Sequence, residues 1–143
     1  MPKKILWMDN DAVMYFGQFM EVLADEGYEV EVATTLSRAD YLIKSRRYDL
    51  LILDVMIPTM SAEEEERYRP EQTESGYKAG LVFYRSNRDL LHANSTHVLV
   101  LTVRLDSAIR DEFITAGLPP DCFATKYEMK DAGRLLGMIR NLI

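Results

Sequence analysis

Short apolar runs alternate with segments of helical periodicity along most of the chain. Runs rich in β-branched and aromatic residues predict five strands, over residues 4–8, 28–33, 49–53, 97–101 and 121–125. Apolar residues spaced three or four apart predict five helices, near residues 13–26, 35–45, 81–91, 109–116 and 132–142. This alternation predicts a parallel sheet with helices on both faces, because right-handed crossovers place helices on each side.

Composition agrees with one globular domain. The 143 residues suffice for a single hydrophobic core, so we expect one domain over residues 1–143. Seventeen basic and 23 acidic residues leave a net charge of −6, which disfavours direct binding to nucleic acid. Cys122 is the only cysteine, so no internal disulfide can form. The apolar runs are too short for a membrane span or a signal peptide, and we expect a cytoplasmic protein that does not bind membranes.

The polar residues that end the predicted strands are the candidates for function. In a parallel sheet the carboxyl ends of the strands meet at one edge, where ligands bind. Each residue alone has an ordinary explanation. An aspartate after a strand can cap the next helix, a threonine can belong to the strand, and a lysine can be a solvated charge. The candidates are Asp9, Asn10 and Asp11 after the first strand, Asp54 after the third, Thr102 after the fourth and Lys126 after the fifth.

Together these residues indicate phosphoryl chemistry. Clustered carboxylates repel one another and attract a cation. A site lined by a few oxygens suits Mg²⁺, which keeps several waters and is completed by a phosphate. A lysine and a threonine can then hold phosphoryl oxygens, and a carboxylate can accept the phosphoryl group covalently. A nucleotide-binding Rossmann or flavodoxin role is disfavoured, because acids and not a glycine-rich loop follow the first strand.

The chain resembles the CheY-like receiver domain of two-component response regulators. The segments that carry the resemblance are KKILWMDND, LLILDVMIP, VLVLTV and CFATK, in that order, and with the intervening helices they cover essentially the whole chain. The resemblance implies a doubly wound α/β fold of the flavodoxin-like receiver type, with five parallel strands in the order 2-1-3-4-5. It also implies a signalling domain and not an enzyme, beyond self-catalysed phosphotransfer and dephosphorylation.

The resemblance also implies roles for single residues. Asp54 would be the phosphoacceptor, Thr102 would bond the phosphoryl group, and Lys126 would pair with it. Phe123 matches the aromatic position that rotates with Thr102 on activation. A histidine kinase or phosphotransfer protein would donate the phosphoryl group. A downstream protein, or a second copy in a homodimer, would bind the surface of the fourth helix, fifth strand and fifth helix. Mg²⁺ would be held by Asp9, Asn10, Asp54 and the backbone carbonyl of Met56.

Three single residues depart from the family pattern. Asn10 stands where the family has a metal-binding acid, so we expect weak Mg²⁺ binding. Val103 follows Thr102 where the family prefers a very small residue, and we expect it to narrow access to Asp54. Tyr127 replaces the proline that commonly follows the lysine, which suggests that Lys126 points elsewhere.

The largest departure is an acidic insertion at about 61–79. Strand-to-helix loops in such folds usually have about two to six residues, so this one is functional or disordered. Ser61 and Glu64 have the spacing of a capping box, and Pro70 would stop a short helix begun there. We expect the glutamates at 63–66 to form a solvated acidic face. The alternative is a lid or partner-docking element beside Asp54 that repels phosphodonors.

Two other functions compete with the phosphorylated receiver. A pseudo-receiver would keep the fold as a binding module that works without phosphorylation, consistent with Asn10, Val103 and the acidic insertion. A phosphatase resembling the haloacid dehalogenase superfamily would use Asp9 as its nucleophile, because residues 9–13 fit an aspartate-x-aspartate-x-valine pattern, with Thr102 and Lys126 as its later motifs. This second alternative explains neither LLILDVMIP nor a helix that begins directly after the acids.

Overall fold

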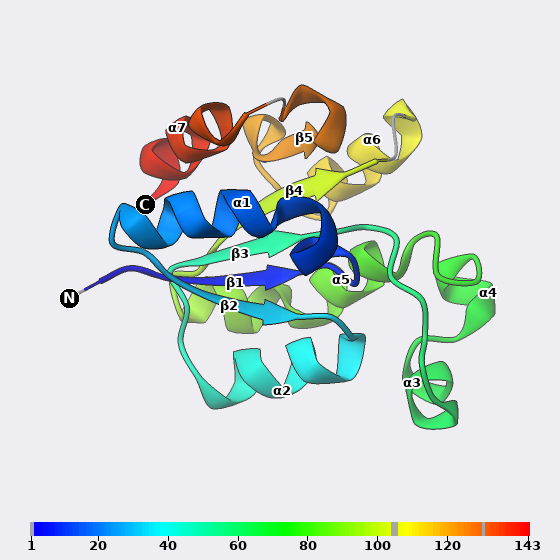
Figure 1. Ribbon diagram of the computed structural model, residues 1–143. Coiled ribbons are helices and arrows are strands. Elements are labelled where there is room, and N and C mark those ends of the chain that lie inside the picture. Colours follow the sequence, from blue (N-terminus) through cyan, green and yellow to red (C-terminus); the bar gives the residue numbers. More distant parts are fainter. Residues whose placement is uncertain (1, 104–105, 130) are drawn as a thin grey trace.

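The computed structural model describes residues 2–103, 106–129 and 131–143, and its centre is a five-stranded parallel sheet (Figure 1). The strand order β2-β1-β3-β4-β5 confirms the predicted 2-1-3-4-5 topology and the α/β fold class. All four neighbouring pairs are parallel, so every strand ends at the same edge. The strands are β1 Lys4–Met8, β2 Glu29–Ala33, β3 Leu50–Leu53, β4 His97–Thr102 and β5 Phe123–Thr125.

The described residues form seven α-helices: the five predicted from periodicity, the short helix predicted to begin near Ser61, and one further short helix. The five predicted helices are α1 Ala12–Asp25, α2 Leu36–Ser45, α5 Ala79–Ala93, α6 Ser107–Thr115 and α7 Ala132–Leu142. The two others, α3 Ala62–Arg67 and α4 Pro70–Thr73, lie in the insertion, and two 3₁₀ turns occur at Pro120–Cys122 and Lys126–Glu128. The predicted start of the fifth strand is wrong, because residues 120–122 are in a 3₁₀ turn that opens on Pro120, whose fixed φ suits a turn.

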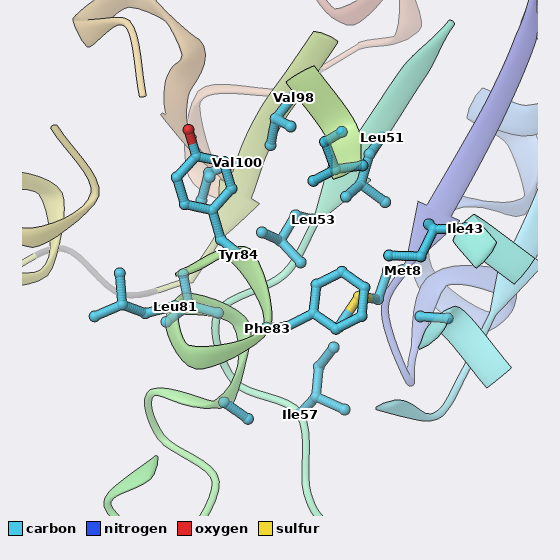
Figure 2. Packing of buried hydrophobic residues seen from close by; sticks show 14 of the residues in the cluster. Met8, Ile43, Leu51, Leu53, Ile57, Leu81, Phe83, Tyr84, Val98 and Val100 are labelled. Atoms are coloured by element: carbon cyan, nitrogen blue, oxygen red, sulfur yellow. The ribbon is translucent and has the colours of Figure 1, made fainter. Parts of the chain in front are cut away.

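Each central strand is buried on both faces, and its side chains alternate between two cores. Leu6, Met8, Leu51 and Leu53 face one core, whereas Ile5, Trp7, Leu50 and Ile52 face the other. Figure 2 shows the first core, where Leu81, Phe83 and Tyr84 of α5 pack over Leu53 and Val100. Helices α1 and α7 cover the second face (Figure 1). Such burial on both faces explains why these strands are continuous apolar runs in the sequence.

Local signals account for the helix ends. The Thr35 side chain accepts a hydrogen bond from the Arg38 backbone N–H and caps α2 as predicted. Gly27 follows the end of α1 with φ +92°, a left-handed conformation that only glycine adopts without strain. Among the helices of the described residues, none has the length and apolar character that a membrane span requires.

The insertion is folded and lies against α2. The Ser61 side chain caps α3 by accepting from the Glu64 N–H, at 3.1 Å. The Glu64 carboxylate completes no capping box, however, because it accepts from the Met60 N–H at 2.7 Å and from the Ser37 N–H, in the first turn of α2, at 2.8 Å. As predicted, the helix that begins at Ser61 ends before Pro70, since α3 ends at Arg67 and Arg69 is extended. The structure adds that Pro70 opens α4, where its missing N–H costs no hydrogen bond.

A buried polar network anchors the end of α3. The Asp40 carboxylate on α2 is 5% exposed. It accepts hydrogen bonds from Arg67 at 3.1 Å, from the Tyr68 hydroxyl at 2.8 Å and from the Asn87 amide of α5 at 3.3 Å. Burial, followed by the Asp40 charge, raises the pKa of Tyr68 well above its usual range, so the hydroxyl stays a donor. The network therefore ties the insertion to two helices of the main fold.

The expectation of a uniformly solvated acidic face needs correction at Glu64. Its neighbours Glu63, Glu65 and Glu66 are exposed, but Glu64 is 2% exposed. Burial by itself raises the pKa of Glu64, yet the hydrogen bonds from Ser37 and Met60, with the Arg67 charge, outweigh it, and the pKa lies below its ordinary value. The buried charge is retained because the first-turn N–H groups of a helix bind an anion well.

Glu64→Gln is expected to lower the free energy of unfolding by about 1–2 kcal/mol, because the amide has a single acceptor oxygen: one of the two backbone N–H donors loses its acceptor and the other keeps an uncharged one. Since the folded-state pKa of Glu64 is lowered, its contribution is present above the pKa of the unfolded chain and is lost as the pH falls through the folded value. Urea unfolding near neutral pH and again in acid measures this difference. Glu66→Gln, on an exposed residue of the same helix, should change little, and equal losses in both variants would contradict the structure.

Candidate functional site

Residues from the ends of three strands meet in one buried charged group. Asp9 follows β1, Asp54 follows β3 and Lys126 follows β5, and the Lys126 Nζ lies 2.6 Å from Asp9 Oδ2 and 3.2 Å from Asp54 Oδ2. Asp9 is 0% exposed and Asp54 is 4% exposed. Asp54 and Lys126 are 72 residues apart in the sequence and are adjacent only because β3, β4 and β5 are neighbours in the sheet. The suggestion that Lys126 points elsewhere is therefore wrong.

Backbone N–H groups hold the two carboxylates. The Asp11 N–H donates to Asp9 Oδ1 at 2.9 Å, and the Met56 N–H donates to Asp54 Oδ1 at 3.4 Å. Asp9 Oδ2 has its ion-pair contact with Lys126 but finds no hydrogen-bond partner of good geometry among the described residues. The Lys126 ammonium is therefore the group that compensates the buried charge on this oxygen.

The carboxylates of Asp9 and Asp54 and the ammonium of Lys126 leave a net negative charge in a largely buried group. Burial, followed by the Asp9 charge, raises the pKa of Asp54 to about 6, although Lys126 and the Met56 N–H act in the opposite direction. Burial by itself lowers the pKa of Lys126, but Asp54 and Asp9 outweigh it and the pKa lies above its ordinary value. Lys126 thus stays an ammonium ion, and Asp54 is a carboxylate kept at a cost in stability.

The two predicted switch residues flank this group on the neighbouring strands. Thr102 is fully buried at the end of β4, where it pairs in register with Thr125 of β5. Phe123 opens β5, and its ring centroid lies 5.8 Å from that of Phe113 on α6. This ring contact joins the start of β5 to α6.

A pocket of about 300 Å³ is lined by the loops that follow Asp9 and Asp54, although neither carboxylate nor Lys126 lines it. Asn10 and Asp11 come from the loop that carries Asp9, and residues 56–58 come from the loop that carries Asp54. Residues 75–77 of the insertion complete the lining, and Gly76 packs closely against the backbone of Ile57 and Pro58. Val103, which we expected to narrow access to Asp54, is 39% exposed and does not line this pocket.

The structure also brings Gly80 to the site, which sequence reasoning missed. Gly80 lies in the first turn of α5, and its N–H donates to the Val55 carbonyl at 2.8 Å. A Cβ at this position would overlap the Asp54 carbonyl oxygen and come within 2.7 Å of Val55 Cα. The glycine lets α5 press directly on the backbone of the Asp54 loop. The only signal in the sequence was a glycine at the start of the third predicted helix, which is not specific.

A larger hollow, of about 450 Å³, lies away from this group. It lies at the amino end of β4, between α5 and the loop before β5, and is lined by Tyr84, Arg88, His97 and Cys122 among others. None of the predicted site residues lines it. The arginine there donates to the Ala116 carbonyl at the end of α6, so its charge has a structural use.

Comparison with known proteins finds the fold but no sequence family. No protein-family model and no curated protein matches the sequence. Among solved structures, the CheY-like response regulator receiver domain protein of Methanospirillum hungatei is 21% identical, with a TM-score of 0.73 over 99% of this chain and 93% of that one. The chemotaxis response regulator CheY4 of Vibrio cholerae is 20% identical, with a TM-score of 0.70 over the whole of both chains.

A third similar structure carries a modified residue. It is a response regulator protein of Burkholderia pseudomallei with a phosphorylated aspartic acid, a calcium ion and citrate. Its identity is 20% and its TM-score is 0.68, over 95% of this chain and 65% of that one. These likenesses establish that the chain has the receiver fold predicted for it.

Proposed function

We propose that this chain is a response regulator receiver domain of a cytoplasmic two-component system, and that Asp54 accepts its phosphoryl group. The observation that carries the proposal is the buried triad of Asp54, Asp9 and Lys126 at the carboxyl edge of the sheet. A structural ion pair has no need of a second buried carboxylate that raises the pKa of the first. The neighbours described as response regulators, one of them with a phosphorylated aspartic acid, support the same function.

The reaction is a phosphoryl transfer between two nucleophiles. An Asp54 carboxylate oxygen attacks the phosphorus of a phosphohistidine on a histidine kinase or phosphotransfer protein. The O–P bond forms, the P–N bond breaks, and the imidazole leaves as a neutral ring with the proton of its second nitrogen. The Lys126 ammonium lies 3.2 Å from Asp54 Oδ2, beside the attacking carboxylate, and would pair with the charge of the phosphoryl oxygens. Thr102 is the hydroxyl that would bond one of them.

The residues at the site fit Mg²⁺, although Asn10 in place of an acid leaves the site with one negative charge fewer than the family pattern has. The carboxylates of Asp9 and Asp54 are both buried and share one ammonium, so the group carries a net negative charge that a cation would offset. The ligands would be Asp9, Asp54, the Asn10 amide oxygen and the Met56 carbonyl. The described residues hold no group of three or more acidic, histidine or cysteine side chains that could bind a metal. A bound Mg²⁺ would supply positive charge against the phosphoryl oxygens, and Asn10 in place of an acid makes its binding weak.

The signal would leave the domain through α6, β5 and α7. Phe123 contacts Phe113 of α6, and Phe113 in turn lies 5.7 Å from Tyr84 of α5, measured between ring centroids. A change in the position of Thr102 or Lys126 on phosphorylation would alter this packing. A downstream protein, or a second copy of the chain, would recognise the altered surface.

Labelling with acetyl phosphate and Mg²⁺ tests the proposal. We expect a single phosphoryl group, mapped by mass spectrometry of peptides to the segment that contains Asp54 and removed by hydroxylamine, which attacks acyl phosphates. The label should decline when Mg²⁺ is replaced by a chelator. A beryllofluoride adduct that forms only with Mg²⁺ would provide a second reading of the same site.

The competing functions predict different outcomes. Absence of both label and beryllofluoride adduct would sink the proposal and favour the phosphorylation-independent pseudo-receiver. Turnover of p-nitrophenyl phosphate that is lost in Asp9→Asn and kept in Asp54→Asn would favour the phosphatase. Helix α1 starts at Ala12, directly after Asp11, and leaves no room for the flap that such phosphatases place there.

A further inference from the structure

The insertion forms one wall of the pocket beside the proposed phosphoacceptor. Residues 75–77, Asn10, Asp11 and residues 56–58 together line a space of about 300 Å³, and Gly76 packs closely against the backbone of Ile57 and Pro58. This volume is at the lower end of small-molecule sites. Two residues that line the pocket adjoin the reacting carboxylates: Asn10 follows Asp9, and the Met56 N–H donates to Asp54. A group placed in this pocket would therefore lie beside a phosphoryl group on its way to Asp54.

The wall is held in place at both ends. Upstream, Glu64, Arg67 and Tyr68 bind α2 through the contacts described above. Within it, the Gly76 N–H donates to the Thr73 hydroxyl at 3.2 Å, and Thr73 is 1% exposed. Downstream, the Lys78 N–H donates to the Thr73 carbonyl at 2.7 Å, and the Lys78 ammonium lies 3.0 Å from Glu112 of α6. An anchored wall of this kind is a fixed surface and not a lid.

The composition of the pocket favours a flat apolar group. Tyr77 lines it and is 57% exposed, and Met56 and Pro58 are the other apolar residues that line it with accessible surface, because the Ile57 side chain is buried in the first core. An aromatic ring gains from packing against another ring or flat group beyond the area that it buries. Of the polar residues that line the pocket, Asn10 and Asp11 belong to the loop after Asp9 and Ser75 belongs to the insertion.

We propose that this pocket receives the imidazole of the phosphodonor and that Tyr77 is a specificity-determining residue, which packs against that ring while the phosphoryl group passes to Asp54. The inference rests on the proposed function. It adds that the insertion selects phosphohistidine-type donors over acyl phosphates. In the transfer the O–P bond to Asp54 forms as the P–N bond breaks, and the leaving group in the pocket is neutral imidazole.

Two small phosphodonors distinguish an effect of Tyr77 on donor binding from an effect on the reactivity of Asp54. Monophosphoimidazole carries the ring and acetyl phosphate does not, and both deliver the same phosphoryl group. The second-order rate constant for labelling of Asp54 is measured for each donor with Mg²⁺. Tyr77→Ala should lower the rate constant with monophosphoimidazole roughly two- to tenfold and leave that with acetyl phosphate unchanged. Tyr77→Phe should restore the wild-type ratio, because the ring and not the hydroxyl makes the contact.

Tyr41→Ala provides the matched control. Tyr41 is 59% exposed, close to the value for Tyr77, but lies on α2 outside the pocket. Its loss should leave the ratio of the two rate constants unchanged. An unchanged ratio in Tyr77→Ala, with Asp54 still labelled by both donors, overturns the role of Tyr77 and leaves the proposed function standing. Absence of label from both donors in the wild-type protein overturns both.

Discussion

Asp54→Asn is expected to abolish phosphoryl labelling completely and, in the same protein, to raise the free energy of unfolding by about 2–3 kcal/mol. Labelling is lost because the amide cannot form the acyl phosphate. Stability rises because the pKa of Asp54 is raised to about 6 by burial and by Asp9, and one pKa unit corresponds to about 1.4 kcal/mol. A neutral side chain of the same shape removes this cost. Proteins often retain such a cost where function requires a strained or charged site.

The gain in stability of Asp54→Asn should depend on pH. A raised pKa in the folded state means that the ionised form of Asp54 destabilises the fold. The cost is absent below about pH 4, where the group is protonated in both states, and complete above about pH 6. Urea unfolding in a chelating buffer should therefore show a gain for Asp54→Asn near neutral pH that disappears in acid. Asp89→Asn, on a fully exposed residue of α5, should show no gain at either pH. A loss of stability in Asp54→Asn at neutral pH would contradict the charge balance assigned to the site.

Gly80→Ala is expected to cost about 3 kcal/mol of stability and to slow labelling of Asp54 by at least tenfold. The added Cβ would meet the Asp54 carbonyl oxygen and Val55 Cα, which are backbone atoms that cannot rotate away. Overpacking against side chains costs about 1–3 kcal/mol, and contact with backbone lies at the upper end. Helix α5 would have to withdraw, with loss of the bond from the Gly80 N–H to Val55. The loop that positions Asp54 would move with it.

The matched control is Gly137→Ala in α7. A Cβ there meets nothing within 4 Å, so alanine should stabilise that helix by about 0.5–1 kcal/mol. Chemical unfolding and the rate of labelling by acetyl phosphate are measured for both variants. If Gly80→Ala behaved like Gly137→Ala, the close approach of α5 to the Asp54 loop would be excluded.

The insertion marks where prediction from the sequence succeeded and where it failed. The spacing of Ser61 and Glu64 predicted the start of a helix, because a cap is a local interaction between residues three apart. The same Glu64 was expected in solvent, and it is buried because its partner, the Ser37 N–H, lies 27 residues away. Pro70 was read as a stop, although proline is also favoured at the first position of a helix. In the structure it does both, since α3 ends before it and α4 begins with it.

The order of strands and helices, the two buried faces of each central strand and the polar residues at the strand ends could all be read from the sequence. They follow from periodicity and from short-range preferences, which neighbouring residues decide. The contact between Lys126 and both carboxylates, the approach of Gly80 to the Asp54 loop and the place of Tyr77 beside the pocket were decided by the tertiary structure. Each joins segments that are distant in the chain, and their distances depend on how strands pair and helices pack.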